Sequence, residues 1–120
     1  MTDRELLELA AKASGFSFDK YVSGSSPEDF HYGLNSGLLK IDRDRLDAVL
    51  WNPLLDDGDA LRLAVKLSMQ LDISASGCLV YLSNSAAPIG ICAYSETRDI
   101  EAATRRAIVR AAAEIGKRGA

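Results

Sequence analysis

The sequence contains few of the residues that most often carry catalytic or metal chemistry. Its 120 residues include one histidine, two cysteines and one tryptophan. His31, Cys78 and Cys92 do not have the spacing of a zinc site. The nucleophile elbow Gly-x-Ser-x-Gly, the P-loop and the dinucleotide-binding glycine fingerprint are also absent. We therefore expect no enzyme activity, no metal and no cofactor. His31 is interpreted as a structural or exposed residue; a hydrolase that pairs it with a serine is the weakest alternative.

The sequence also lacks long apolar runs and a strong excess of charge. No stretch approaches the roughly 20 apolar residues that span a membrane, and the polar start at Thr2–Glu5 is unlike a signal peptide. The formal net charge of −3 argues against general nucleic-acid binding, which depends on neutralising phosphates. We expect one soluble domain, residues 1–120, in the cytoplasm, where both cysteines stay reduced.

The first predicted helix covers residues 2–14. Thr2 followed three residues later by Glu5 is typical of a capping box, and Gly15 ends the segment. Helical spacing predicts one core-facing stripe, with Leu7 beside it: Leu6, Leu9, Ala10 and Ala13.

A second helix is predicted over residues 57–69. Pro53 bends the chain before it, and the carboxylates of the segment Asp56-Asp-Gly-Asp59 suit the unpaired N–H groups of a first turn. An EF-hand reading fails because Leu61 follows where oxygen ligands are needed. Trp51 is interpreted as a packing anchor rather than as a residue that stacks on a ligand.

This second helix is apolar around most of its circumference. Its polar stripe consists of Arg62, Lys66 and Gln70 only. A helix of this kind must be covered on more than one side, so it either sits deep or forms a contact between subunits.

Residues 16–50 are the least regular part of the sequence. Short strands are expected around Phe16–Val22 and Leu38–Ile41, separated by the loop Ser23–Pro27. The alternating charges of Asp42–Asp47 indicate an exposed loop or a short helical turn.

A β-hairpin is predicted from residues 77–83 and 88–95. Placing the apolar sets on one face pairs residue 82 with 89, 80 with 91, and 78 with 93. Cys92 then lies opposite Leu79, the two thiols point apart, and no disulfide is expected unless a bulge shifts the register. Tyr81 and Tyr94 become neighbours, either under a second layer of helix or on an exposed aromatic platform.

The last predicted helix covers residues 99–116. Its narrow apolar stripe, dominated by alanine, consists of Ile100, Ala103, Ala107, Ile108, Ala111 and Ile115. Glu101–Arg105 and Arg110–Glu114 are expected i,i+4 ion pairs. Residues 73–120 carry six Lys/Arg against four Asp/Glu. This basic end is either a solvated helix face or a surface for an anion or an acidic partner. The candidate interaction surface therefore consists of Arg98, Arg105, Arg106, Arg110, Tyr81 and Tyr94.

Together these segments predict an α+β fold ordered helix, strands, helix, hairpin, helix. The helices are expected to pack on a mainly antiparallel sheet. No internal repeat and no long linker divides the chain.

Three segments resemble a group of small phage and prophage proteins. They are the opening residues 1–15, the segment from Trp51 to residue 71, and residues 99–117 with the run Ala103-Thr-Arg-Arg-Ala-Ile-Val-Arg. The group is the phage α/β/α-sandwich domain family, whose function is generally unassigned. Residues 16–50 are longer than the short hairpin usual in that family.

The resemblance implies a bacterial host but brings no site residues. It leads us to expect a non-catalytic accessory protein that binds a host or immune protein, in the manner of an anti-CRISPR inhibitor. The alternative is an oligomeric module that sequesters a nucleotide-like anion, such as an immune second messenger, between arginines and Trp51 or the tyrosines.

Overall fold

The computed structural model describes residues 1–24, 36–42, 44–83 and 85–119. It is an α+β fold with two three-stranded antiparallel sheets, ordered β1-β2-β3 and β4-β5-β6. The elements in chain order are α1 (Asp3–Ser14), β1 (Lys20–Val22), β2 (Gly37–Asp42), β3 (Asp47–Trp51), α3 (Asp57–Lys66), β4 (Met69–Ser74), β5 (Gly77–Leu82), β6 (Gly90–Ala93), α4 (Tyr94–Thr97) and α5 (Ile100–Lys117).

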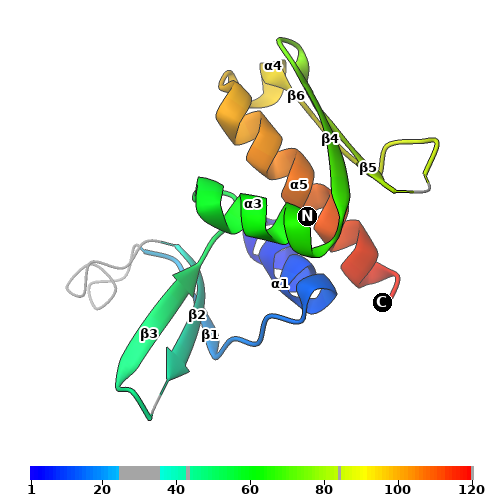
Figure 1. Cartoon of the computed structure of the whole chain (residues 1–120). Coiled ribbons are helices and arrows are strands. Elements are labelled where there is room, and N and C mark those ends of the chain that lie inside the picture. The colour runs from blue at the N-terminus through cyan, green and yellow to red at the C-terminus, as the bar shows by residue number, and fades with distance from the viewer. Residues whose placement is uncertain (25–35, 43, 84, 120) are drawn as a thin grey trace.

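The two sheets lie at opposite ends of the molecule, with α1, α3 and α5 between them (Figure 1). The fold class predicted from the sequence is confirmed, but the strands form two sheets rather than one. Within the described residues, no helix is long and apolar enough to cross a membrane.

Helix α5 is the centre of the packing. It contacts α1, α3 and the sheet β4–β6, and it is buried on a broader face than its alanine stripe predicts, since Val109, Ala112 and Ala113 are also buried. Glycines allow two of these approaches. A Cβ at Gly116 would collide with the carbonyl oxygen of Leu9 in α1, and a Cβ at Gly90 with the carbonyl oxygen of Ala107 in α5.

Helix α1 begins where the sequence predicts. The Thr2 hydroxyl accepts from the Glu5 N–H at 3.2 Å and donates to the Glu5 carboxylate at 3.1 Å, and Gly15 ends the helix in a left-handed conformation. The predicted stripe is rotated, because α5 covers a neighbouring face of α1. The buried residues are Leu6, Leu7, Ala10, Ala11 and Ser14.

Helix α3 starts at the predicted cap, since the Asp56 carboxylate accepts from the Asp59 N–H at 2.8 Å. It ends at Lys66, three residues early, because Ser68 turns the chain with a φ of 53°. Gln70 therefore belongs to β4 and not to the polar stripe of the helix. Apolar and polar residues alternate over Met69–Ser74, which is typical of a strand, and this strand is not among the sequence-based predictions.

Strand β3 is also absent from the sequence-based prediction, and Trp51 is its last residue. It pairs with β2 so that Leu38 lies opposite Trp51 and Lys40 opposite Val49. Because side chains alternate along a strand, these four residues share one face of the sheet β1–β3.

The predicted register of the β5–β6 hairpin is wrong by one residue. Cys78 lies opposite Cys92, and Leu79 lies opposite Ile91. The two cysteines therefore face the same side, toward α5, and both are buried free thiols. In the observed register Gly77 pairs with Ala93 and Gly90 pairs with Val80. Both glycines lie where a Cβ would collide with backbone, Gly77 with Cys92 of β6 and Gly90 with Ala107 of α5.

Candidate functional site

The arginines of the predicted surface are mostly engaged within the chain. Arg105 donates to the Leu54 carbonyl oxygen at 2.9 Å and pairs with Asp57, while Arg106 pairs with Asp3 at 3.2 Å. These contacts replace the expected pair Glu101–Arg105 and spread the basic residues over several faces.

Arg110 is also engaged within the chain. It pairs with Glu96 at 2.9 Å and donates to the Ile91 carbonyl oxygen at 2.8 Å, so the expected pair with Glu114 does not form. Only Arg98 stands exposed, at the end of α4 with a φ of 55°, without an ion pair among the described residues.

The predicted adjacency of Tyr81 and Tyr94 is wrong. Tyr81 is half-buried in β5 opposite Gln70 of β4, whereas Tyr94 is 42% exposed in α4. They lie toward opposite ends of the hairpin and cannot form one platform. His31 lies outside the described residues.

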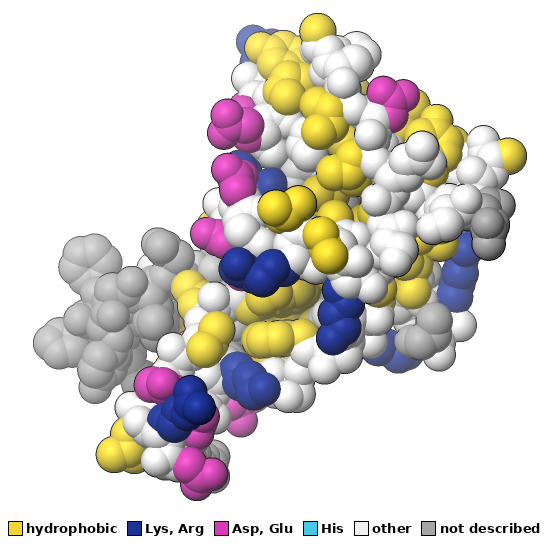
Figure 2. Space-filling view, in the orientation of Figure 1, with side chains coloured by type: hydrophobic (Ala, Val, Ile, Leu, Met, Phe, Trp, Pro, Cys, Tyr) yellow, Lys and Arg dark blue, Asp and Glu magenta, His cyan; other side chains and the backbone are white. Residues whose placement is uncertain are grey.

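A different set of residues forms a cavity of about 390 Å³ between α3, the end of α1 and the hairpin β2–β3. Its floor is aromatic: the rings of Phe16 and Trp51 stack with centroids 4.9 Å apart and planes 18° apart. We call this cavity the aromatic pocket. Figure 2 shows a hydrophobic surface beneath α3 with Lys and Arg side chains around it.

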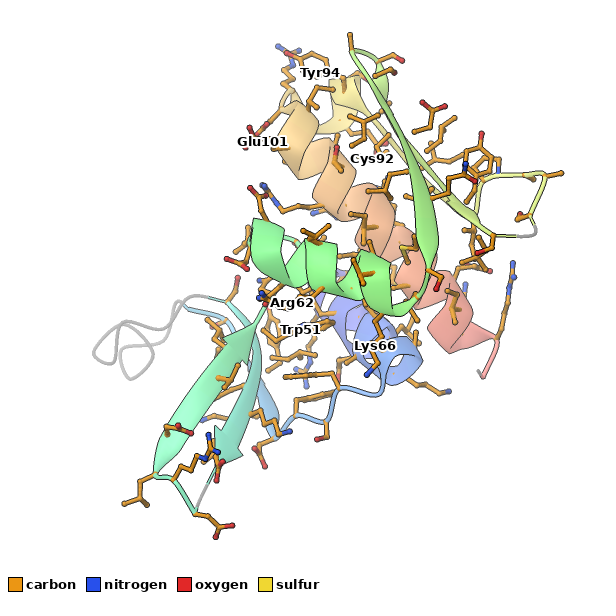
Figure 3. The ribbon with its side chains drawn as sticks, in the orientation of Figure 1. Trp51, Arg62, Lys66, Cys92, Tyr94 and Glu101 are labelled. Carbon is orange, nitrogen blue, oxygen red and sulfur yellow. The ribbon has the colours of Figure 1, made fainter. Side chains whose placement is uncertain are left out.

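Three cations line the aromatic pocket: Lys40 from β2, and Arg62 and Lys66 from α3. The ammonium group of Lys40 lies 5.9 Å from the centroid of the Phe16 ring, within cation–π range. Arg62 and Lys66 extend from α3 toward the side on which Trp51 lies (Figure 3). Positive side chains therefore outnumber negative ones in this pocket, although the chain as a whole has a net charge of −3.

The local sequence explains how these side chains converge. Gly15 ends α1 in a left-handed turn that Cβ-bearing residues disfavour, so the chain reverses directly before Phe16. Arg62 and Lys66 are four residues apart and therefore share one face of α3.

One carboxylate, Asp59, also lines the pocket, but its charge is compensated. One of its oxygens accepts from Arg62 at 2.7 Å and the other from the N–H of Asn52 at 3.0 Å. Asp59 thereby fixes the connection between β3 and α3 and orients Arg62. Lys40 and Lys66 form no ion pair with any described residue, so they are available to a ligand.

The shifted pKa values lie away from the aromatic pocket. Burial raises the pKa of the Cys78 and Cys92 thiols, so neither is an activated thiolate. Hydrogen bonds from Arg110 and from the Ala93 N–H lower the pKa of Glu96 from 4.5 to about 2. No group of three or more His, Cys, Asp or Glu residues with the arrangement of a metal site exists among the residues that the structure describes.

Sequence reasoning missed this site in part. The sequence-based predictions interpret Trp51 as a packing anchor, with a ligand site between arginines and Trp51 or the tyrosines as the alternative, and they interpret Arg62 and Lys66 only as the polar stripe of the second helix. Phe16 and Lys40 come from the irregular segment, and no spacing in the sequence relates them to α3. No family model, no curated protein and no solved structure matches the chain.

Proposed function

We propose that the protein binds a small planar anion of nucleotide-like chemistry in the aromatic pocket. One observation carries the proposal: a stacked Phe16–Trp51 floor lies beneath three cations, two of which have no ion-pair partner among the described residues. The cavity volume of about 390 Å³ lies in the range of small-molecule sites.

The residues divide into two roles. A base would pack against Phe16, because Trp51 is only 8% exposed and supports the Phe16 ring from beneath. Lys40, Arg62 and Lys66 would contact the phosphate, and the arginine fork suits two phosphate oxygens at once. All five residues come from one chain, so binding requires no second subunit.

The proposed role is sequestration of this anion, such as an immune second messenger, in the cytoplasm of a bacterial host. The resemblance to phage and prophage proteins supports that setting, and a site without an activated nucleophile among its described residues suits binding rather than turnover.

A titration of Trp51 fluorescence tests the proposal. Trp51 is the only tryptophan, so emission excited at a wavelength that the four tyrosines do not absorb reports on this pocket. We expect at least one member of a panel of linear and cyclic nucleotides to change the emission saturably and to raise the melting temperature. Inorganic phosphate and the uncharged nucleoside should each bind more weakly, since each supplies half of the contacts.

Substitution of Lys66 separates specific from general electrostatic binding. Lys66→Ala should weaken nucleotide binding about tenfold, or roughly 1.4 kcal/mol, because a charge-assisted contact is lost. Lys117→Ala, an exposed lysine at the end of α5, removes the same charge at a distance and should leave affinity unchanged. Equal effects of both variants, or no response to any nucleotide, would disprove the proposal.

A second function, binding of a host or immune protein, is favoured by a separate observation. Leu61 and Val65 on α3 are 60% and 70% exposed, and Ile73 on β4 is 52% exposed. Solvent-facing aliphatic side chains gathered on one side of a protein are typical of an interaction surface.

A further inference from the structure

The two edges of the sheet β4–β6 differ in how their backbone groups are satisfied. At the β6 edge, the Ile91 carbonyl oxygen accepts from Arg110 at 2.8 Å and the Ala93 N–H donates to Glu96 at 3.0 Å. The ion pair of Arg110 and Glu96 thus closes this edge against another strand.

The β4 edge is open. The Tyr94 N–H donates to the Ser76 carbonyl oxygen. Because the direction of the backbone hydrogen-bonding groups alternates along a strand, the even-numbered residues of β5 bond β6 and its odd-numbered residues bond β4. Through the β4–β5 register, the outward backbone groups of β4 belong to Met69, Leu71 and Ile73. Within the described part of the chain, no hydrogen bond to another element occupies them.

An apolar groove of about 320 Å³ runs beside this open edge, between β4, α3 and α5. Its walls include Leu61, Leu71, Ile73, Ile100 and Ile108. Figure 2 shows hydrophobic side chains gathered over α3 and the adjoining sheet. A strand added to β4 would place every second side chain in the groove, because β4 itself directs Leu71 and Ile73 to that side.

The rim of the groove is acidic. Asp57 is neutralised by Arg105, whereas Glu101 is exposed, has no ion pair among the described residues and lies at the first turn of α5 (Figure 3). A basic side chain on the incoming segment would complement Glu101.

We propose that the β4 edge and its groove bind an extended segment of a partner protein by strand addition. The segment alternates apolar and polar residues and carries one Lys or Arg. The proposal specifies the surface behind the second function above and is independent of the aromatic pocket.

Selection from a displayed library of random eight-residue peptides tests the proposal on the full-length chain. We expect the selected peptides to show apolar residues at every second position and at least one basic residue. In the isotope-labelled protein, a selected peptide should slow amide exchange of Met69, Leu71 and Ile73 at least tenfold. The amides of Gln70 and Asp72, already bonded to β5, should change little. No nucleotide should compete.

Two matched substitutions complete the test. Ile73→Lys should weaken peptide binding at least tenfold, and Ile91→Lys should leave it unchanged, although these isoleucines are 52% and 50% exposed. Leu61→Lys provides a second groove variant on a different element, and the melting temperature verifies that each variant folds.

Several results would overturn the proposal. One is a selection that does not enrich peptides with alternating apolar residues. Another is an equal loss of peptide affinity in Ile73→Lys and Ile91→Lys. A third is amide exchange of the outward β4 residues that does not change when a peptide binds. A concentration-dependent dimer that Ile73→Lys abolishes would assign the edge to a second copy instead. A partner that bound through another surface would leave the β4 amides unchanged, which separates failure here from failure of protein binding in general.

Discussion

The Glu96 carboxylate joins β6 to α5 through two donors. Arg110 and the Ala93 N–H both hydrogen-bond it, at 2.9 Å and 3.0 Å, and these bonds lower its pKa from 4.5 to about 2. The side chains of Arg110 and Glu96 are 33% and 43% exposed, so solvent screens much of their attraction. The contact contributes more to closing the sheet edge than to overall stability.

The lowered pKa of Glu96 predicts a pH-dependent contribution to stability. A carboxyl group with a lower pKa in the folded state stabilises that state fully above its unfolded value of 4.5, and this contribution disappears as the pH falls toward about 2. Wild type should therefore be more stable than Glu96→Gln at pH 7, and the difference should shrink between pH 4.5 and 2. Urea unfolding across this range measures it.

Glu8→Gln is the control, since Glu8 forms an exposed i,i+4 pair with Arg4 that does not bridge two elements. If the difference in the free energy of unfolding between wild type and Glu96→Gln stayed constant down to pH 2, the lowered pKa of Glu96 would not be its cause.

At the scale of elements, the close contact of α1 and α5 depends on Gly116. A Cβ there would meet backbone atoms of Leu9, which cannot move without moving α1. Gly116→Ala should destabilise the protein by about 1–2 kcal/mol, because overpacking outweighs the gain in helix propensity. Chemical denaturation gives the change in the free energy of unfolding.

Gly58 in α3 offers the matched comparison. The nearest atoms to a Cβ at Gly58 would be the guanidinium nitrogens of Arg62 and a carboxylate oxygen of Asp56, at 3.2 Å, and these are side-chain atoms rather than the backbone of another helix. Gly58→Ala should be neutral or slightly stabilising. If the two alanine variants had the same effect, propensity rather than helix contact would govern both positions.

At the scale of the whole molecule, Arg105 connects α5 to the chain between β3 and α3. Its side chain is 15% exposed and bonds the Leu54 carbonyl oxygen and Asp57. Arg105→Ala should lower the free energy of unfolding by about 1–3 kcal/mol, because a buried carbonyl group loses a charged donor. It should also weaken nucleotide binding, since Trp51 and Arg62 flank this connection.

Arg118→Ala is the control for Arg105. Arg118 is 63% exposed and 3.9 Å from Glu114, so its loss should change stability by less than about 0.5 kcal/mol. Thermal unfolding combined with the Trp51 titration distinguishes the two variants. Loss of stability without loss of binding would mean that Arg105 does not position the pocket.

Prediction succeeded where the determining contacts are local. Each of the three long helices begins after a residue whose side chain accepts from an N–H group two or three residues further on, namely Thr2, Asp56 and Asp99. Prediction failed where the buried face of a helix or the partner of a charged side chain depends on an element far away in the sequence. The buried face of α1 depends on α5, and the partners of Arg105 and Arg110 lie on α3 and α4 rather than one helical turn away.

The candidate site divides in the same way. Arg62 and Lys66 are recognisable from helical spacing alone, and Trp51 from its position before a helix. The sheet register that turns Lys40 toward them depends on pairing between β2 and β3, and the stacking of Phe16 on Trp51 depends on where α1 ends relative to that sheet. Pairing and stacking are both long-range contacts that composition does not encode.

The α+β class is predictable from the order of helical and strand patterns along the sequence. The helix starts and the end of α1 at Gly15 are also predictable, because each depends on interactions within one turn of the chain. Three features depend instead on contacts between distant segments: the division of the strands into two sheets, the internal ion pairs of the arginines of α5, and the gathering of cations over an aromatic floor. A one-residue shift of register, or a rotation of a helix about its axis, leaves local energies nearly unchanged but exchanges every long-range neighbour.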